Sequence, residues 1–138
     1  CDVDQVAALH MWAASNQSAA NEAFSISNDD PCALGDIWGA IAQAMDMKPE
    51  FRPKGFDTTA FLRQGRALWP DIIQKHGLKQ TSYDTLTNTS EISILASHDW
   101  ETRYDLEKLR QAGFDRHVDS KEMFTRWINH LRQTKIVP

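Results

Sequence analysis

Few residues in this chain have types and spacing that could do chemistry. Tyr104 and Lys108 are one candidate pair, because residues four apart face the same side of a helix. A lysine so placed lowers the pKa of a tyrosine, and the phenol can then exchange a proton with a substrate oxygen. The neighbouring Asp105 and Glu107 would neutralise the field of the lysine. The sequence therefore favours a coincidence over a catalytic pair.

The segment His98-Asp99-Trp100-Glu101 is the second candidate, with an imidazole close to two carboxylates. An acid/base cluster is one interpretation, and a solvated helix start is the one we favour. The five histidines form no HxxxH or HExxH pair, and Cys1 and Cys32 make no ligand motif. No Gly-x-Ser-x-Gly turn is present to expose a nucleophile. We therefore predict neither a catalytic residue nor a metal site.

The turn at residues 27 to 31 stands where a nucleotide-binding fold would have its phosphate loop. Residues 23 to 26 alternate as a β-strand does, and a helical pattern begins at Leu34. The turn has no glycine, and its Asp29 and Asp30 would repel a phosphate. A lone strand cannot satisfy its own backbone. We expect it to pair within this chain, with another copy, or with a further part of a longer protein.

Composition limits the classes of function. The chain has 138 residues, 41% hydrophobic and 25% charged, which suits one globular domain. A net charge of -4 and an isoelectric point near 5.7 argue against a nucleic-acid partner. No apolar run could span a membrane, and the cysteine usage favours a reduced, cytoplasmic setting. Because the chain begins at Cys1 and enters a helix at once, we expect it to be part of a longer protein.

Helical patterns surround the predicted strand. Residues 2 to 15 suit a helix that places Val3, Val6, Leu9 and Ala13 on one side. Residues 34 to 45 follow the most regular helical spacing in the chain, with Trp38 on the apolar face.

The second half of the chain is also mainly helical. Residues 58 to 76 predict two short helices separated before Pro70, the second ending at Gly77. A short helix at Leu106 and Leu109 should stop at Gly113 in a Schellman cap. The last helix is predicted by a capping box, and its apolar face includes a tryptophan. The residues of the box are Asp119 and Glu122, and the tryptophan is Trp127.

Five tryptophans are many for this length. We expect Trp38 and Trp127 in the core, because both lie on apolar helix faces. Trp12, Trp69 and Trp100 lie where a groove or docking surface could use them.

Several motifs together resemble the C-terminal part of extended short-chain dehydrogenases, most closely the progesterone 5β-reductase and iridoid synthase-like enzymes. The motifs, in chain order, are Asp2 and Asp4, Trp12-Ala13-Ala14, Asn21-Glu22-Ala23-Phe24, Trp38, WPDIIQKHGL at 69–78 and DLEKLRQAGFDRHVDSKEMFTRWINHLRQTKIVP at 105–138. The resemblance covers essentially the whole chain.

The resemblance implies an α+β fold that is mainly helical, with one or two short strands. Residues 1–138 would form a single lobe, the C-terminal substrate-binding lobe of an α/β Rossmann-type enzyme. The glycine-rich loop for NADP or NAD, with the catalytic Tyr and Lys, would belong to an N-terminal half absent from this chain. Residues 23 to 27 would add a late strand to that half's sheet. The fragment alone would bind no cofactor and would be inactive.

The resemblance also implies where a substrate would bind. Residues 91 to 98 would supply apolar pocket walls, here Ile92, Leu95 and Ala96, with Trp69 and Phe61 as further candidates. In the similar enzymes this stretch is rich in aromatic residues, so the pocket here would differ in shape. The parent enzyme would transfer hydride to a small apolar enone or carbonyl compound. Residues 90 to 97 have strand propensity, whereas the family's pattern makes them helical, and both stay open.

Two other functions stay open. The lobe of a nucleotide-sugar epimerase or dehydratase would need cations for a diphosphate, and Arg63, Arg66 and Arg103 are available. A self-contained, non-catalytic helical binding module is the other. The expected partners are the absent N-terminal half and a small-molecule substrate, with a homodimer through the open strand edge as a further option. Neither a nucleic acid nor a membrane is expected.

Overall fold

A computed structural model describes residues 1–50, 57–87 and 103–138. The stretch at 90–97, the segment 98–101 and the candidate residues Ile92, Leu95 and Ala96 lie outside the described residues. The described helical elements are α1 (Val3–Ser15), the 3-10 turn η1 (Gln17–Ala19), α2 (Leu34–Ala44), α3 (Thr58–His76), α4 (Tyr83–Leu86), α6 (Glu107–Gln111) and α7 (Ser120–Gln133). These ranges contain no β-strand, so the described part of the chain is helical with extended connections.

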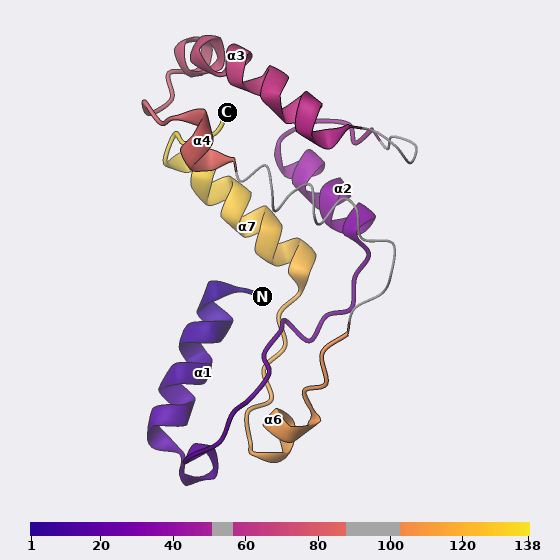
Figure 1. The fold of residues 1–138 in the computed structure, drawn as a ribbon, viewed down its shortest axis with the longest axis vertical. Helices are drawn as coiled ribbons and strands as arrows, with labels where there is room; N and C mark the ends of the chain where they lie inside the picture. Colours follow the sequence, from indigo (N-terminus) through magenta and orange to yellow (C-terminus); the bar gives the residue numbers. More distant parts are fainter. Residues whose placement is uncertain (51–56, 88–102) are drawn as a thin grey trace.

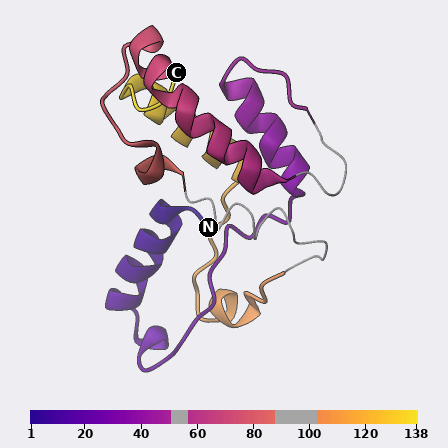
Figure 2. The ribbon, with the colours of Figure 1, turned by 45° about the horizontal axis from the view of Figure 1, so that its top comes forward.

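Helices α2 and α7 lie side by side and pack against each other (Figure 1). Helices α1 and α6 lie at one end of the molecule, and α3 and α4 lie at the other end with the C-terminus (Figure 2). Two extended segments, preceding α2 and α7, run close together between the ends (Figure 1). They are joined where the Val118 N–H donates to the Asn28 carbonyl at 3.0 Å.

Three predicted helix ends are confirmed, at Asp119, Gly77 and Gly113. At the start of α7, the Asp119 carboxylate accepts the Glu122 N–H at 2.9 Å. Gly77 ends α3 in the left-handed region, at φ 60°. Gly113, at φ 101°, lets the Phe114 N–H return to the Leu109 carbonyl at 3.2 Å, as a Schellman cap requires.

Helix α3 corrects the prediction of two short helices, because it continues through Pro70. An interior proline removes one hydrogen bond and crowds the preceding turn, which costs about 3 kcal/mol. Caps at both ends favour continuity, since Asp57 accepts the Ala60 N–H at 2.8 Å and Gly77 closes the last turn. Trp69 and Ile73 lie half-buried and buried on either side of the proline, so packing also stabilises the junction.

The predicted strand at residues 23 to 26 has the side-chain alternation of a strand but no sheet. Phe24 and Ile26 are half-buried, whereas Ala23 and Ser25 are exposed. In the described part of the chain, residues 23 to 27 make no backbone–backbone hydrogen bond. An extended segment without a neighbouring ladder is not a β-strand, so the described residues do not confirm the predicted strand.

Two burial predictions were wrong. Trp38 is 48% exposed and Trp127 is 36% exposed, so neither lies in the core. At α1 the N-cap Asp2 and, within the helix, Gln5 are buried, while Val3 lies at the surface. Val6 and Leu9 of the predicted apolar side are half-buried.

Candidate functional site

An open groove lies between α3 and the segment that leads into α4. The rings of Trp69 and Tyr83 line it, with centroids 6.4 Å apart and planes at 59°. The Trp69 indole N–H donates to the Thr81 carbonyl at 2.7 Å, and the Tyr83 hydroxyl donates to the Leu62 carbonyl at 2.7 Å. Both aromatic tips are therefore bound to backbone, and their rings line the groove together with polar side chains such as Gln74 and Gln80.

Gly65 makes the close approach of Tyr83 to α3 possible. A Cβ at this position would lie 2.6 Å from the Tyr83 hydroxyl oxygen and 3.2 Å from its ring. Any other residue would displace the ring from the groove. Tyr83 and the glycine are features that the sequence alone did not connect.

Charges on the groove rim are mutually paired. Arg66 and Asp84 form an ion pair, so this arginine is partly neutralised. Arg63 lies exposed three residues earlier on α3, and Arg103 is exposed before α6. The three arginines proposed for a diphosphate thus include one that already binds a carboxylate, which reduces the positive charge available for an epimerase-type site.

Two of the five predicted substrate-site residues lie within the described structure. Trp69 lines the groove, and Phe61 lies on the same helix, 56% exposed. The two are eight residues apart, an offset of about 80° around the helix axis, so they lie toward the same side of α3, about two turns apart. Ile92, Leu95 and Ala96 lie outside the described residues.

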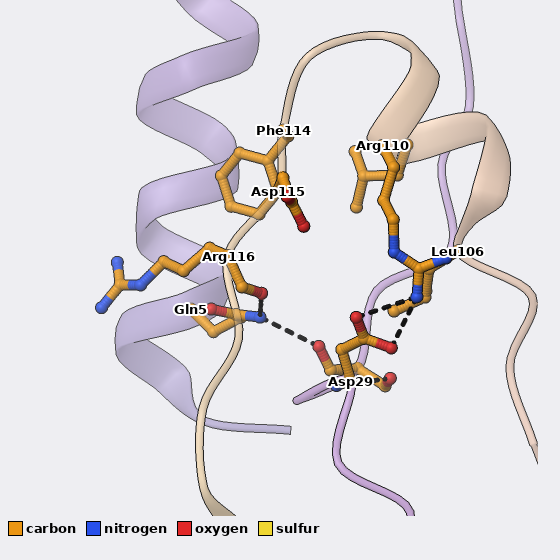
Figure 3. Close-up of a pocket in the computed structure, with 9 residues that line it drawn as sticks. Gln5, Asp29, Leu106, Arg110, Phe114, Asp115 and Arg116 are labelled. Carbon is orange, nitrogen blue, oxygen red and sulfur yellow. Dashed lines mark hydrogen bonds and ion pairs between the residues drawn. The ribbon is translucent and has the colours of Figure 1, made fainter.

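The carboxylates of the acidic turn bind neighbouring elements, and Figure 3 shows Asp29 beside Arg110. The Asp29 carboxylate accepts two hydrogen bonds from Arg110 Nη2, at 2.7 and 2.8 Å, which raises the pKa of Arg110. The Asp30 carboxylate accepts the Ser120 N–H at 2.7 Å, and this bond lowers the pKa of Asp30. The two carboxylates therefore hold α6 and α7 in place.

A second cluster joins the start of α1 to α7. Arg126 pairs with Asp2, and with Asp4 at 2.9 Å. Burial acts to raise the pKa of Asp2, but the Asp4 N–H, the Trp127 indole and Arg126 together hold it below its usual value. Trp127 stays at the surface because its polar N–H serves this carboxylate and its ring lies 5.5 Å from the Arg126 guanidinium.

Lys108 does not face Tyr104. Its ammonium donates to the Ala23 carbonyl at 2.9 Å, pairs with Glu22 at 2.8 Å and lies 5.2 Å from the centre of the Phe24 ring. The pair with Lys108 lowers the pKa of Glu22. Lys108 thus fastens α6 to the extended segment, as expected if its spacing to Tyr104 is a coincidence.

Metal and membrane features were sought in the residues that the structure describes. Within these ranges, no three side chains of His, Cys, Asp or Glu gather as a metal site would require. None of the described helices is both long enough and apolar enough to cross a bilayer.

The chain is similar to oxidoreductases along almost its whole length. It is 27% identical over 140 residues to an (S)-8-oxocitronellyl enol synthase from Camptotheca acuminata, and 28% identical over 141 residues to one from Nepeta racemosa. Each alignment covers 99% of this chain but 36% of the synthase. A short chain dehydrogenase from Penicillium aethiopicum is 22% identical over 148 residues, which are 96% of this chain and 39% of that protein. No family model matches.

The matches confirm the resemblance read from the motifs. This chain corresponds to the C-terminal part of iridoid synthase-like short-chain dehydrogenases, and it spans about a third of the length of these relatives. Its similarity to an oxidoreductase portion is thereby shown.

Proposed function

We propose that this chain is the substrate-binding C-terminal portion of an NAD(P)H-dependent oxidoreductase that acts on a small apolar enone or carbonyl compound. The observation that carries the proposal is the similarity over 99% of the chain to enol synthases of which it spans only 36%. In this proposal NADP or NAD is bound by an N-terminal half, and the 138 residues supply no catalytic group. We propose that the enzyme acts in the cytoplasm.

The extended segment before α2 supports the division into two halves. Residues 23 to 27 have strand-like side-chain alternation, and Lys108 and Gln5 hold the carbonyls of Ala23 and Ser27 at its two ends. Side chains thus hold both ends of the segment, and within the described ranges residues 23 to 27 make no backbone–backbone hydrogen bond. A strand of the N-terminal half's sheet is the partner that we propose.

Aromatic side chains on α3 and beside it support a substrate-side role. The groove offers the rings of Trp69 and Tyr83, and Phe61 presents a further aromatic side chain on the same helix. Apolar rings without unpaired polar tips suit a substrate with few polar groups. Ile92, Leu95 and Ala96 complete the proposed pocket.

The first test is the intact mass and activity of the protein isolated from its natural source. We expect a chain two to three times longer than this one, which oxidises NADPH or NADH when small enones or carbonyl compounds are added. A protein that begins near Cys1, or a longer one that consumes neither cofactor with these substrates, would contradict the proposal.

Phe61→Ala in the natural protein tests the pocket wall. We expect KM for an apolar substrate to rise roughly fivefold, about 1 kcal/mol of lost apolar contact, with kcat little changed. Leu68→Ala is a matched control, because Leu68 lies on the same helix and is 58% exposed against 56% for Phe61. Equal KM and kcat for wild type and the Phe61 variant would show that Phe61 does not line the pocket.

A further inference from the structure

Gln5 has a side-chain amide whose orientation is fixed by its neighbours. Its Nε2 donates to the Ser27 carbonyl at 3.1 Å and to the Arg116 carbonyl at 2.7 Å (Figure 3). The reversed amide would set its oxygen against two carbonyl oxygens, which repel it. The other end of the amide is therefore Oε1, which can only accept hydrogen bonds.

That oxygen is buried and has no protein donor. Gln5 is 1% exposed, and among the residues that the structure describes no group donates to its Oε1. A buried acceptor without a donor is destabilising, and in native proteins such atoms are nearly always satisfied. The neighbouring extended segments supply carbonyl oxygens rather than donors to this side chain.

Gln5 borders a small cavity between α1, the acidic turn and α6. The cavity volume is about 10 Å³, which is close to the least that holds one water molecule. Leu106, Leu109 and Phe114 supply apolar walls, while Asp29 and Arg110 supply polar ones (Figure 3). A buried water needs two to four polar partners, and this lining provides acceptors and donors.

We propose that this cavity is a binding site for a single structural water molecule, which donates a hydrogen bond to Gln5 Oε1. The water completes the polar junction at which α1, the acidic turn and residues 114–116 meet. The water donates its second hydrogen bond to a carboxylate of the lining and accepts one from a guanidinium N–H. The inference rests on the packing around Gln5 and does not depend on the proposed function.

A high-resolution crystal structure of the natural protein tests the site. We expect a well-ordered water peak in the cavity at about 2.8 Å from Gln5 Oε1, with a B-factor similar to that of the surrounding main chain. Gln17 is the internal control, because it carries the same amide at the surface of η1 and should show only mobile solvent. A cavity without density beside an unpaired Oε1 would overturn the proposal, and so would an Oε1 bonded directly to a protein N–H.

Gln5→Met adds a second readout. Methionine has a similar length but no amide, so the variant should lose the water peak and melt at a lower temperature, whereas Gln17→Met should melt as the wild type does. A water peak that persists unchanged in Gln5→Met would show that Oε1 does not hold it. If the variant does not fold, the density in the wild-type protein decides the question alone.

Discussion

At the scale of single residues, the acidic side chains near the extended segment are structural. Asp29 has a left-handed backbone, at φ 56°, which a non-glycine residue adopts only at some cost. Its two hydrogen bonds from Arg110 and the contact of its carbonyl with His117 Nδ1 at 3.0 Å compensate for that cost. The carboxylates of this turn therefore have structural partners, and the turn needs no phosphate to account for its conformation.

The stability of the protein should depend on the charge of Asp2. Asp2→Asn keeps the N-cap, since asparagine caps as well as aspartate, but it weakens the bonds to Arg126 and Trp127. We expect a loss of about 1–3 kcal/mol in the free energy of unfolding at neutral pH, measured by urea denaturation. The folded-state pKa of Asp2 is depressed, so its contribution is present above the usual value of 3.8 and is lost as the pH falls below it.

The difference between wild type and Asp2→Asn should therefore vanish at acid pH. Asp71→Asn is the control, because Asp71 is an exposed aspartate on α3 and should leave the urea midpoint almost unchanged. A difference that stays constant from neutral pH to well below 3.8 would show that the charge of Asp2 contributes nothing.

At the scale of elements, α3 shows how tertiary contacts override local preference. It includes Pro70 and the glycine Gly65, both of which disfavour a helix interior. The glycine admits the Tyr83 ring, and the ring in turn hydrogen-bonds the backbone of α3 at Leu62. The groove beside Trp69 depends on Gly65, which lowers the helix propensity of α3 but lets the Tyr83 ring approach closely.

Gly65→Ala should destabilise the protein although alanine is the better helix former. The added Cβ would lie 2.6 Å from the Tyr83 hydroxyl oxygen, so the ring must shift and lose its bond to Leu62. We expect a net loss of about 1–2 kcal/mol in the free energy of unfolding, from the broken bond and lost packing.

Gly39→Ala is the matched control, a glycine inside α2 with no heavy atom near its added Cβ. It should gain about 0.5–1 kcal/mol from helix propensity alone. Thermal unfolding of both variants checks the pair. Two changes of the same sign would mean that Tyr83 does not occupy the place described for it.

At the scale of the whole molecule, Asn28 joins segments that are far apart in the sequence. Its Oδ1 accepts the Asp2 N–H at 2.6 Å, and its Nδ2 donates to Ser120 Oγ at 3.0 Å. One buried side chain thus connects the start of α1 with the start of α7. It acts beside the ion pairs of Arg126 with Asp2 and Asp4, which join the same two helices at the surface.

Asn28→Ala should uncouple α1 from α7. The buried Asp2 N–H and the Ser120 hydroxyl both lose a partner, and we expect a loss of roughly 2–4 kcal/mol in the free energy of unfolding. Hydrogen exchange should show α1 amides exchanging faster than α7 amides. Asn129→Ala, at an exposed position of α7, should leave the exchange of α1 unchanged. Uniform exchange across both helices in Asn28→Ala would contradict a joining role.

The sequence by itself determined the helix ends and the relationship to known enzymes. Caps such as Asp119 and Gly113 act through bonds to residues a few positions away, so a short stretch of sequence contains the whole interaction. The motifs from Asp2 to the closing helix likewise indicate the similarity to the C-terminal parts of short-chain dehydrogenases that the relatives confirm. The candidate residues at 92 to 96 remain a prediction from that resemblance.

Only the tertiary structure decided which side of each helix is buried. On α1 the apolar pattern favoured Val3, yet Gln5 is buried, because its amide meets the Arg116 carbonyl from a segment 111 positions away. Trp127 lies at the surface, where its indole serves Asp2 at the other end of the chain. A helical pattern describes the helix alone, whereas burial depends on which polar groups distant segments bring to it.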